Sequence, residues 1–519
     1  MIVRSSALFV PPGHPLEEDV RATAEIVNPA YLEHERMVRS GVRSRRADKP
    51  PQYLQVWRLI PGGHRWAGGT LIPRCWSPPK LGRLIRQDVF EHYADTPLSG
   101  VATLADGFAL RDYQQAAVDA FVDNECGVVV MPCGAGKTST GVGVIQRLQR
   151  RTLILVHTVD LGRQWIERIA GTEEFDGQLD GVTVGTVGGG RKSTDEGADV
   201  VVATIQTLTK MPWRELYEWG KGFGLVILDE AHHAPAETFL AVLNGMPARY
   251  RLGLTATPDR EDGMGSLLWA AFGDVAHQVD RGELIARGAI RPARLVVHNT
   301  GSVVGTHEFK AGPKSKWIPV QAGEEYRQAK RAVDRARDEG APWPKVKLRP
   351  WAAQVSELVA DPERNEMIVE LAAAKVDEGH SVIILSERVA HCRALAKALR
   401  ERGVSAQAVA GSQKPAQVSA ILAAARRREV RVLVGTTKAD EGLDVPVLSC
   451  GILATRTKKF GRLTQRLGRI ERPEGLAPEW HDLVDAFPSA QRAWKDRRKL
   501  YEALQLEGAA WKRGRRGAA

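Results

Sequence analysis

Short, mostly apolar runs alternate with amphipathic segments over the middle of the chain, and turns that contain glycine separate them. A run that is apolar nearly throughout predicts a strand buried on both faces, which is typical of a parallel sheet between layers of helices. The strands that this pattern predicts are 127–131, 152–157, 199–203, 224–228, 251–255 and 275–279. We therefore expect an α/β domain with a parallel sheet over residues 106–298.

The same rhythm returns after residue 359. Helices predicted at 367–376, 392–402 and 416–428 alternate with strands predicted at 381–385 and 430–435 and with a further segment at 406–410. This alternation indicates a second α/β domain over residues 359–500. The predicted fold class is α/β, with two tandem domains built on parallel sheets and a small N-terminal accessory module.

The two ends of the chain differ in composition from these domains. Residues 1–105 are rich in turns that contain proline and glycine, which predicts short strands in a small separate module. Within it, basic residues stand beside aromatic ones, namely Arg43, Arg45, Arg46, Lys49, Tyr53 and Trp57. This composition suits phosphate contacts and base stacking, but a solvated basic loop beside core aromatics would contain the same residues. Residues 501–519 form a basic tail.

Residues 299–358 interrupt the α/β pattern and are expected to form a linker or insertion. A charged helix is predicted over 324–339, and tryptophans follow at Trp343 and Trp351. Two interpretations of these tryptophans remain open. They pack a linker between the two domains, or they act as a wedge or clamp on a nucleic-acid strand.

The composition is that of a folded protein with a basic balance. The 519 residues carry a formal net charge of +11, which favours a polyanionic partner, although solubility alone would also account for it. The five cysteines are scattered and include no CxxC pair, so neither a disulfide framework nor a zinc knuckle is indicated. Because we find no signal-peptide core and no long apolar run, we expect a cytoplasmic protein that does not enter a membrane.

One loop has the composition of a phosphate-binding site. It follows the first predicted strand, opens a predicted helix, and consists of Gly134, Ala135, Gly136, Lys137 and Thr138. Backbone N–H groups at such a helix N-terminus bind phosphate, the lysine reaches the β- and γ-phosphates, and the threonine hydroxyl binds Mg²⁺. We therefore expect ATP and Mg²⁺ to bind here.

Two adjacent carboxylates, Asp229 and Glu230, follow another predicted strand. Side chains at that end of a strand project from the carboxyl edge of the sheet, where ligands bind in open α/β folds. Asp229 suits the Mg²⁺ shell, and Glu230 suits orienting and deprotonating an attacking water. The following pair His232–His233 is not expected to hold zinc, because adjacent histidines in a turn rarely converge on one ion.

With these and further motifs in a characteristic order, the chain resembles the superfamily 2 helicases of the branch that contains XPB and UvsW, which is related to type I and type III restriction motors. The resemblance extends from about residue 110 to residue 487. The motifs that carry it are 110–114, 134–138, Thr158 with 164–165, Thr204 with Gln206, 229–232, 255–257, 386–388, 436–437 with 441–444, and 465–472. The resemblance implies that both α/β domains are RecA-like and that the ATP site is divided between them.

The resemblance also implies a role for each motif residue. Nucleotide contacts beyond the phosphate loop would come from Arg111, Gln114, Gly442 and Asp444. Arg469 and Arg472 would act as arginine fingers that offset charge on the γ-phosphate. Contacts to the nucleic-acid backbone would come from Thr158, Thr204, Arg388 and Thr436. Residues that couple nucleotide state to the grip on the strand would be His232, Thr255, Thr257 and Gln465.

The function implied by this resemblance is an ATP-dependent DNA helicase or translocase that unwinds or remodels duplex or branched DNA in replication, recombination or repair. DNA is preferred over RNA because the His232–His233 pair and the Thr-Ala-Thr-Pro run resemble the XPB and UvsW branch. The alternatives are a duplex-translocating motor subunit of a restriction or nuclease system, and an RNA helicase. We expect a monomer that works with replication or recombination proteins. The direction of movement is left open.

Overall fold

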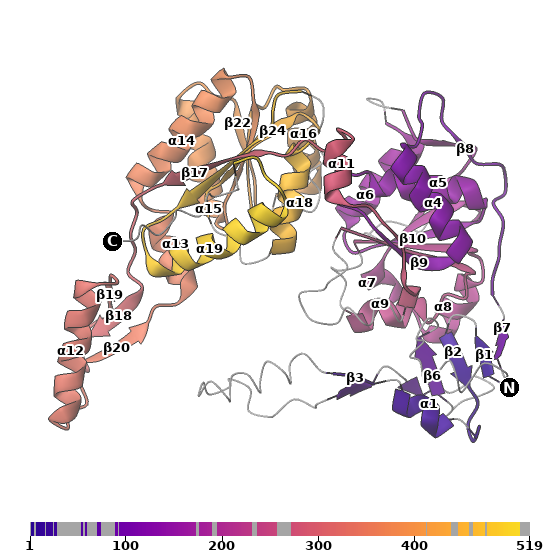
Figure 1. The fold of residues 1–519 in the computed structure, drawn as a ribbon, viewed down its shortest axis with the longest axis horizontal. Coiled ribbons are helices and arrows are strands. Elements are labelled where there is room, and N and C mark those ends of the chain that lie inside the picture. Colours follow the sequence, from indigo (N-terminus) through magenta and orange to yellow (C-terminus); the bar gives the residue numbers. More distant parts are fainter. Residues whose placement is uncertain are drawn as a thin grey trace, which may run out of the picture. The chain divides into compact units, whose positions relative to one another are not determined.

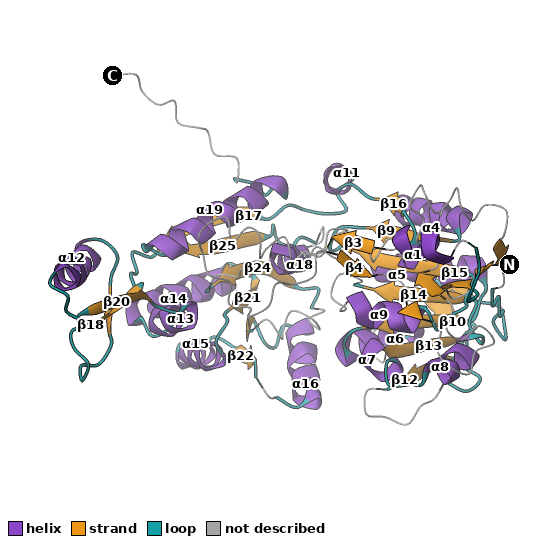
Figure 2. Cartoon of the chain, turned by 90° about the horizontal axis from the view of Figure 1, so that it is seen from below, coloured by secondary structure: helices purple, strands orange, loops and turns teal. Residues whose placement is uncertain are grey.

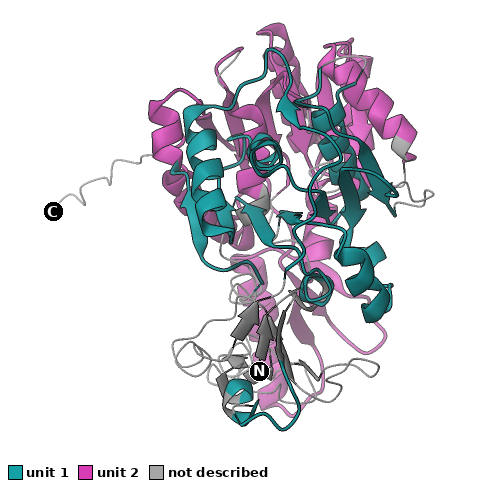
Figure 3. Ribbon diagram, turned by 90° about the vertical axis from the view of Figure 1, so that its right-hand side faces the viewer, with its two compact units in different colours: residues 1–280 teal, residues 281–519 magenta. Residues whose placement is uncertain are grey.

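The structure is a computed structural model that divides into two compact units, residues 1–280 and 281–519 (Figure 3). The described residues are 2–4, 7–15, 17–23, 25–27, 53–55, 58–59, 70–73, 89–91, 93–172, 176–188, 195–230, 236–256, 271–411, 413–436, 445–455, 460–472 and 475–508. No helix among them is long and apolar enough to cross a membrane.

The first unit contains a seven-stranded sheet in the order β12-β13-β10-β14-β15-β9-β16, and every pairing in it is parallel. Its strands are β9 Cys126–Val130, β10 Thr152–Val156, β12 Val184–Val187, β13 Val200–Thr204, β14 Leu225–Asp229, β15 Tyr250–Thr255 and β16 Val275–Gln278. All the predicted strands are confirmed. The edge strand β12 was not predicted, because it is short, contains glycine and buries only alternate residues.

Helices lie on both sides of this sheet, with α4 to α6 on one side and α7 to α9 on the other (Figure 1). They are α4 Asp112–Asn124, α5 Lys137–Leu148, α6 Val159–Ala170, α7 Ile205–Leu208, α8 Trp213–Gly220 and α9 Ala236–Leu243. The helices α5 and α6 approach closely at Gly141, where a Cβ atom would come within 2.5 Å of the Trp165 ring. Glycine at this position therefore lets the buried Trp165 fill the space between the two helices.

The second unit contains a six-stranded parallel sheet in the order β17-β25-β24-β21-β23-β22. Its strands are β17 Arg294–Asn299, β21 Ser381–Leu385, β22 Ala406–Val409, β23 Val432–Gly435, β24 Leu448–Leu453 and β25 Glu479–Val484. The two strands predicted here are confirmed as β21 and β23, and the segment 406–410 contains the strand β22. The α/β class with two parallel-sheet domains is confirmed with them.

The boundary expected at residue 298 needs correction. All of β17 except Asn299 falls inside the expected first domain, yet each of its residues pairs with β25 in the second sheet, and the units divide after Asp280. The sequence did not reveal this because no change of composition separates the two units, and the pairing of β17 joins residues far apart in the chain.

Helices of the second unit are α11 Arg281–Ala286, α13 Trp351–Leu358, α14 Pro362–Asp377, α15 Val389–Glu401, α16 Pro415–Arg426, α18 Phe460–Ile470 and α19 Pro488–Ala503. The Asp361 side chain accepts a hydrogen bond from the Arg364 N–H at 3.1 Å and so caps α14. Buried ion pairs join helices to the sheet, with Arg364 on Asp485 and Arg497 on Asp482, each at 2.7 Å.

The expected linker 299–358 contains a small folded layer in addition to connecting segments. An antiparallel sheet in the order β19-β18-β20 consists of β18 His307–Lys310, β19 Ile318–Val320 and β20 Lys345–Leu348. The predicted charged helix is confirmed as α12, Glu324–Asp338. Figure 2 shows this layer beside α13 and α14 at one end of the second unit.

Short strands also occur in residues 1–105, as predicted. A five-stranded sheet in the order β5-β6-β2-β1-β7 consists of β1 Ile2–Arg4, β2 Ala7–Val10, β5 Arg58–Leu59, β6 Thr70–Pro73 and β7 Val89–Glu91. A second pair joins β3 Glu25–Val27 to β4 Tyr53–Gln55. The basic cluster Arg43, Arg45, Arg46 and Lys49, together with Trp57 and the tail after residue 508, lies outside the described residues.

Candidate functional site

The phosphate loop joins β9 to α5 and depends on glycine for its shape. Gly134 and Gly136 both have φ near +84°, in the left-handed region that side chains other than glycine rarely adopt. Gly136 is the N-cap of α5, so the helix starts at Lys137. The first N–H groups of a helix have no partner within it, and they carry the positive end of its dipole. The loop therefore offers the donors and the charge that a phosphate group requires.

Two residues of α4 hold the loop in place. The Gln114 side-chain amide donates to the Ala135 carbonyl at 2.9 Å, and the Tyr113 hydroxyl donates to the same carbonyl at 3.2 Å. The Gln114 amide oxygen in turn accepts from the Arg111 backbone N–H at 2.9 Å. A Cβ atom on Gly136 would lie 2.2 Å from Nε2 of Gln114. Gln114 is thus in contact with the phosphate loop, and Tyr113 is a loop contact that the sequence pattern did not single out.

The two predicted carboxylates lie at the end of β14, within reach of the loop lysine. The Lys137 ammonium is 3.3 Å from Oε1 of Glu230. Glu230 itself has φ +50°, and its backbone N–H donates to Oδ1 of Asp229 at 2.9 Å. The strained turn directs successive side chains of the strand end toward the loop. Lys137, Asp229 and Glu230 are therefore brought together as the sequence predicted.

A buried indole completes this cluster. Trp165 in α6 has no exposed surface, and its Nε1–H donates to Oδ2 of Asp229 at 2.7 Å. The sequence pattern included Trp165 in a motif, but its contact with Asp229 depends on the packing of α6 against the sheet. No local signal could have shown that contact.

Burial and neighbouring charges set the electrostatics of the site. Burial raises the pKa of Asp229 to about 6, and the nearby Glu230 charge adds to this, while Lys137 and the Trp165 hydrogen bond oppose it. Burial alone would lower the pKa of Lys137, but the charge of Glu230 is the main influence that keeps this pKa raised. The lysine is therefore a permanent cation beside two acids.

The donor set fits Mg²⁺. Asp229 offers a carboxylate that is 4% exposed at the carboxyl edge of the sheet, and Thr138 offers a hydroxyl in the first turn of α5. A hard cation with oxygen ligands from one or two protein groups and from phosphate is the usual form of such a site. An Mg²⁺ ion there would also favour the ionised form of Asp229 against the effect of burial.

A different acidic cluster in the second unit does not need a metal. Ligand atoms of Glu378, His380 and Glu479 lie within 4.8 Å of one another. The Lys375 ammonium is 2.7 Å from Glu378 and 2.8 Å from Glu479, so a side chain already supplies the positive charge.

Only some of the residues expected to couple nucleotide state to strand grip are among the described residues. Thr255 ends β15, is fully buried, and its carbonyl accepts from the Met131 N–H at 2.9 Å. This bond joins the end of β15 directly to the start of the phosphate loop. His232 and Thr257 lie outside the described residues.

Two candidate strand contacts lie together at the carboxyl edge of the first sheet. Thr158 follows β10 and caps α6, accepting from the Leu161 N–H at 3.2 Å. Thr204 ends β13 directly beside Val156, and its hydroxyl is 2.8 Å from that of Thr207. A pocket between α6, β12 and β13 adjoins Thr204, and Arg163 of α6 also lines it. This edge therefore combines hydroxyl groups with a cation.

The motif residues of the second unit occupy strand ends and helix starts. Arg388 is the N-cap of α15 and donates to the Ala352 carbonyl at 2.7 Å. Thr436 follows β23 and is buried. Gly442 and Asp444 lie outside the described residues.

The last motif lies on α18. Gln465 and Arg469 are four residues apart on this helix, which places them on one face, and Arg472 follows the helix end. Between the two arginines, the buried Glu471 accepts hydrogen bonds from Arg281 at 2.7 and 2.8 Å and from the Ala293 N–H at 3.1 Å. Glu471 thus anchors the end of α18, a structural role that the sequence did not indicate.

Two family models match this chain over the regions that contain these sites. The type III restriction enzyme res subunit model matches residues 107–260, and the helicase conserved C-terminal domain matches residues 363–474. The chain belongs to superfamily 2 of the helicases. It is therefore an ATP-hydrolysing enzyme with relatives of the XPB type, as the motif order predicted.

Individual proteins of known name are also similar to this helicase. It is 28% identical to the DNA 3'-5' translocase XPB2 of Sulfurisphaera tokodaii, over 71% of this chain and 80% of that protein. It is 29% identical to the DNA 3'-5' helicase XPB of Mycobacterium tuberculosis, over 74% of this chain but 61% of that longer protein. Among solved structures, Dbp5 of S. cerevisiae bound to RNA and ADP BeF3 matches with a TM-score of 0.52 and 14% identity, covering 76% of this chain and 88% of Dbp5. The last likeness supports the tandem RecA-like fold.

Proposed function

We propose that this helicase moves along DNA from 3' to 5' and uses ATP hydrolysis to unwind or remodel duplex or branched DNA. The observation that carries the proposal is the cluster of Lys137, Asp229 and Glu230 around a glycine-shaped phosphate loop. Relatives with XPB names support DNA as the track and 3' to 5' as the direction. We also propose a monomer that acts with replication or recombination proteins.

In the proposed ATP site, each residue of the first unit has one task. The N-terminus of α5 and Lys137 bind the β- and γ-phosphates, while Asp229 and the Thr138 hydroxyl hold Mg²⁺, which supplies charge neutralisation. Glu230 orients the attacking water and accepts its proton. Lys137 is 3.3 Å from Glu230, so a phosphate bound by the lysine would lie next to the proposed base.

The second unit would contribute the groups that complete hydrolysis. Arg469 and Arg472 would stabilise the charge that develops on the γ-phosphate. Arg469 lies near the anchored end of α18 and Arg472 directly follows that end, which would fix their approach. Gly442 and Asp444 would contact the nucleotide, and Arg111 and Gln114 would contact adenine.

Contacts with the nucleic-acid track would come from both units. The backbone contacts would be made by Thr158, Thr204, Arg388 and Thr436, through hydroxyl and guanidinium donors that read phosphate rather than base. Coupling of this grip to nucleotide state would involve His232, Thr255, Thr257 and Gln465. The bond between the Thr255 carbonyl and Met131 supports this, because it links a coupling residue to the phosphate loop.

A second candidate function is a motor that translocates on duplex DNA without separating its strands. The match of residues 107–260 to a restriction-enzyme motor subunit favours this alternative. A strand-displacement assay on duplexes with a 3' or a 5' single-stranded tail separates the two. Displacement from the 3'-tailed duplex supports the helicase, and DNA-stimulated ATPase activity without displacement of either duplex supports the translocase.

Two variants test the ATP site itself. Lys137→Ala and Glu230→Gln are each expected to reduce DNA-stimulated ATP turnover by at least about 100-fold, because one loses the phosphate cation and the other the base. Both should retain DNA affinity, measured by anisotropy of a labelled fork. Parental turnover in either variant would show that the site is assigned wrongly.

A further inference from the structure

The small layer formed by β18, β19, β20 and α12 has two different faces. α12 packs on one face, where the Tyr326 ring stacks on His307 with ring centroids 4.0 Å apart. Side chains of a strand alternate between its two faces. Glu308, which follows His307 in β18, therefore points away from α12. Lys347 of β20 pairs with Glu308 and points the same way.

The face away from α12 carries lysines on adjacent strands. Lys310 of β18 pairs directly with Lys345 of β20, and Glu308 pairs with Lys347. Lys345 and Lys347 are exposed, and Lys310 is half-buried. The acidic residue on this face among the described pairings is Glu308, which is 3.1 Å from the Lys347 ammonium.

Two tryptophans lie among these lysines. The Lys347 ammonium is 4.1 Å from the centroid of the Trp317 ring. Lys310 and Lys345 are 4.9 and 4.5 Å from the centroid of the Trp343 ring. Both rings are half-buried and so keep part of their surface in solvent. We call the five residues Trp317, Trp343, Lys310, Lys345 and Lys347 the lysine–tryptophan face.

This arrangement of charges does not stabilise the sheet. Two like charges directly opposite each other on neighbouring strands destabilise the pairing, and Lys310 and Lys345 are such a pair. Stacking of the ammonium groups on the Trp343 ring offsets part of that cost. A bound polyanion would offset the rest, so the charge pattern is complementary to phosphate groups.

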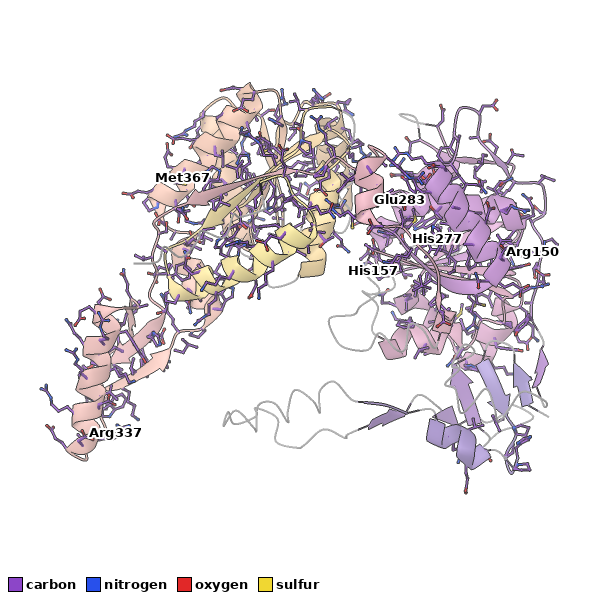
Figure 4. All side chains as sticks on the ribbon, in the orientation of Figure 1. Arg150, His157, His277, Glu283, Arg337 and Met367 are labelled. Atoms are coloured by element: carbon purple, nitrogen blue, oxygen red, sulfur yellow. The ribbon has the colours of Figure 1, made fainter. Side chains whose placement is uncertain are left out.

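The other tryptophan of the expected linker behaves differently. Trp351 packs against an apolar cluster of Val304, Leu358, Phe487 and Ala490. Trp351 therefore packs inside the second unit, whereas Trp343 lies among cations on a sheet face. The end of α12 at Arg337 is at the outer end of the same layer (Figure 4).

We propose that the lysine–tryptophan face binds an unpaired nucleic-acid strand, with its lysines on phosphates and its tryptophan rings on bases. Aromatic rings stack only on bases that are not already stacked within a duplex, which selects an unpaired strand over a paired one. The inference rests on the proposed function to the extent that it requires a nucleic-acid track. It adds a strand contact outside the motifs of the two parallel-sheet domains.

The lysines are tested by a charge-removing triple variant and a matched control. K310Q/K345Q/K347Q removes three charges from the face, and K330Q/R331Q/R335Q removes three exposed charges from α12 in the same layer. The probe is fluorescently labelled oligo-dT of about 16 nucleotides, titrated at several salt concentrations. Loss of three phosphate contacts reduces the slope of log affinity against log salt by about 2, since each contact contributes about 0.7 for a single strand.

The expected result is a reduced slope in the first variant and a slope close to that of the parent in the α12 control. Equal changes in both variants would show general attraction to a basic protein, and would overturn the proposal. No change in the first variant would overturn it as well.

The rings are tested by W317A/W343A against W317F/W343F. The alanine variant loses two stacking rings and is expected to bind oligo-dT at least about 30-fold more weakly, because each stacked base is worth about 1 kcal/mol or more. The phenylalanine variant keeps a stacking ring and is expected to remain near the parent. Affinity for a blunt duplex should be similar in all three proteins, and an equal loss for duplex and single strand would contradict the proposed preference.

Failure of the proposed function gives a different result. A parent protein that binds neither oligo-dT nor duplex has no nucleic-acid track, which would reject the function as well as this face. A parent that binds both, with affinities that none of these substitutions changes, would reject the face alone. Parental ATPase activity without DNA confirms that each variant is folded.

Discussion

At the scale of single residues, Trp165 joins two sites that the motifs describe separately. It donates a hydrogen bond to Asp229, and its ring contacts the α5 helix at Gly141. The N-cap of its own helix is Thr158, a candidate strand contact. One helix therefore carries a proposed nucleic-acid contact at its start and, two turns later, a hydrogen-bond donor to Asp229, the proposed Mg²⁺ ligand.

Trp165→Phe would keep most of the ring and remove the donor. Because a hydrogen bond to a charged group is worth about 1.5–3 kcal/mol, we expect the Mg²⁺ concentration for half-maximal ATPase activity to change by about tenfold or more. The measurement is ATP turnover during an Mg²⁺ titration. A control is Trp480→Phe, which also loses a buried indole hydrogen bond, to the Tyr501 hydroxyl at 3.0 Å, but in the second unit. An unchanged Mg²⁺ dependence in Trp165→Phe would show that Trp165 does not position Asp229 for Mg²⁺.

At the scale of elements, the end of α18 is fixed by a buried ion pair. The Glu471 side chain is 1% exposed and that of its partner Arg281 is 14% exposed. Arg281 also donates to the Leu504 carbonyl at 2.8 Å, so this one guanidinium ties α11, α18 and the end of α19 together. The proposed arginine fingers, Arg469 on α18 and Arg472 just after it, would depend on that anchor for their position.

Glu471→Gln is expected to lower the free energy of unfolding of the second unit by roughly 3 kcal/mol, because it leaves the Arg281 charge buried without its counter-charge. Urea unfolding followed by circular dichroism measures this change. Glu502→Gln breaks the exposed pair with Arg498 and should cost less than about 1 kcal/mol. If the two substitutions lowered the free energy of unfolding equally, the buried pair of Glu471 would stabilise the fold no more than the exposed pair.

The elements also show how far sequence reasoning reaches. Strands such as β10, β14 and β21 were predictable because each is a buried run of five apolar or mostly apolar residues. The layer of β18 to β20 was missed, since its strands have three or four residues and mix charged with apolar side chains. Short antiparallel strands gain their stability from pairing across the chain, which no local pattern reports.

In the candidate site, too, some features were predictable from the sequence and others were not. The phosphate loop and the carboxylate pair were predictable, because their chemistry requires fixed residue types at fixed spacing. The contacts of Gln114, Tyr113 and Trp165 were not, because each joins residues of different elements. Such contacts are set by packing, so they become visible only in three dimensions.

At the scale of the whole molecule, the second unit holds histidines that burial keeps neutral. Burial lowers the pKa of His391 to about 4, with the Arg364 charge contributing. The His391 imidazole forms hydrogen bonds with two neutral partners. Its Nε2 is 2.8 Å from the Asn365 amide oxygen, and its Nδ1 is 2.9 Å from the Ser386 hydroxyl. Burial likewise lowers the pKa of His481 to about 4, and the neighbouring His298 adds to this.

This unit should therefore lose stability in mild acid. The unfolded chain takes up a proton on each histidine below its ordinary pKa of about 6.5, whereas the folded chain does so only near pH 4. The free energy of unfolding then falls as pH decreases from about 6.5 to about 4, by up to about 1.4 kcal/mol per pH unit for each histidine. Urea unfolding at several pH values measures the slope. His391→Gln should make it shallower, and a slope equal to that of the parent would contradict the assignment.

The order of strands in the first sheet sets a length that the ATP site must span. β9 carries the phosphate loop and β14 carries the carboxylates, and β15 lies between them. Two interstrand spacings amount to about 10 Å. The loop from Met131 and the long side chain of Lys137 together cover that gap, because the ammonium comes within 3.3 Å of Glu230. The intervening strand β15 therefore sets the distance that the loop and the Lys137 side chain must bridge.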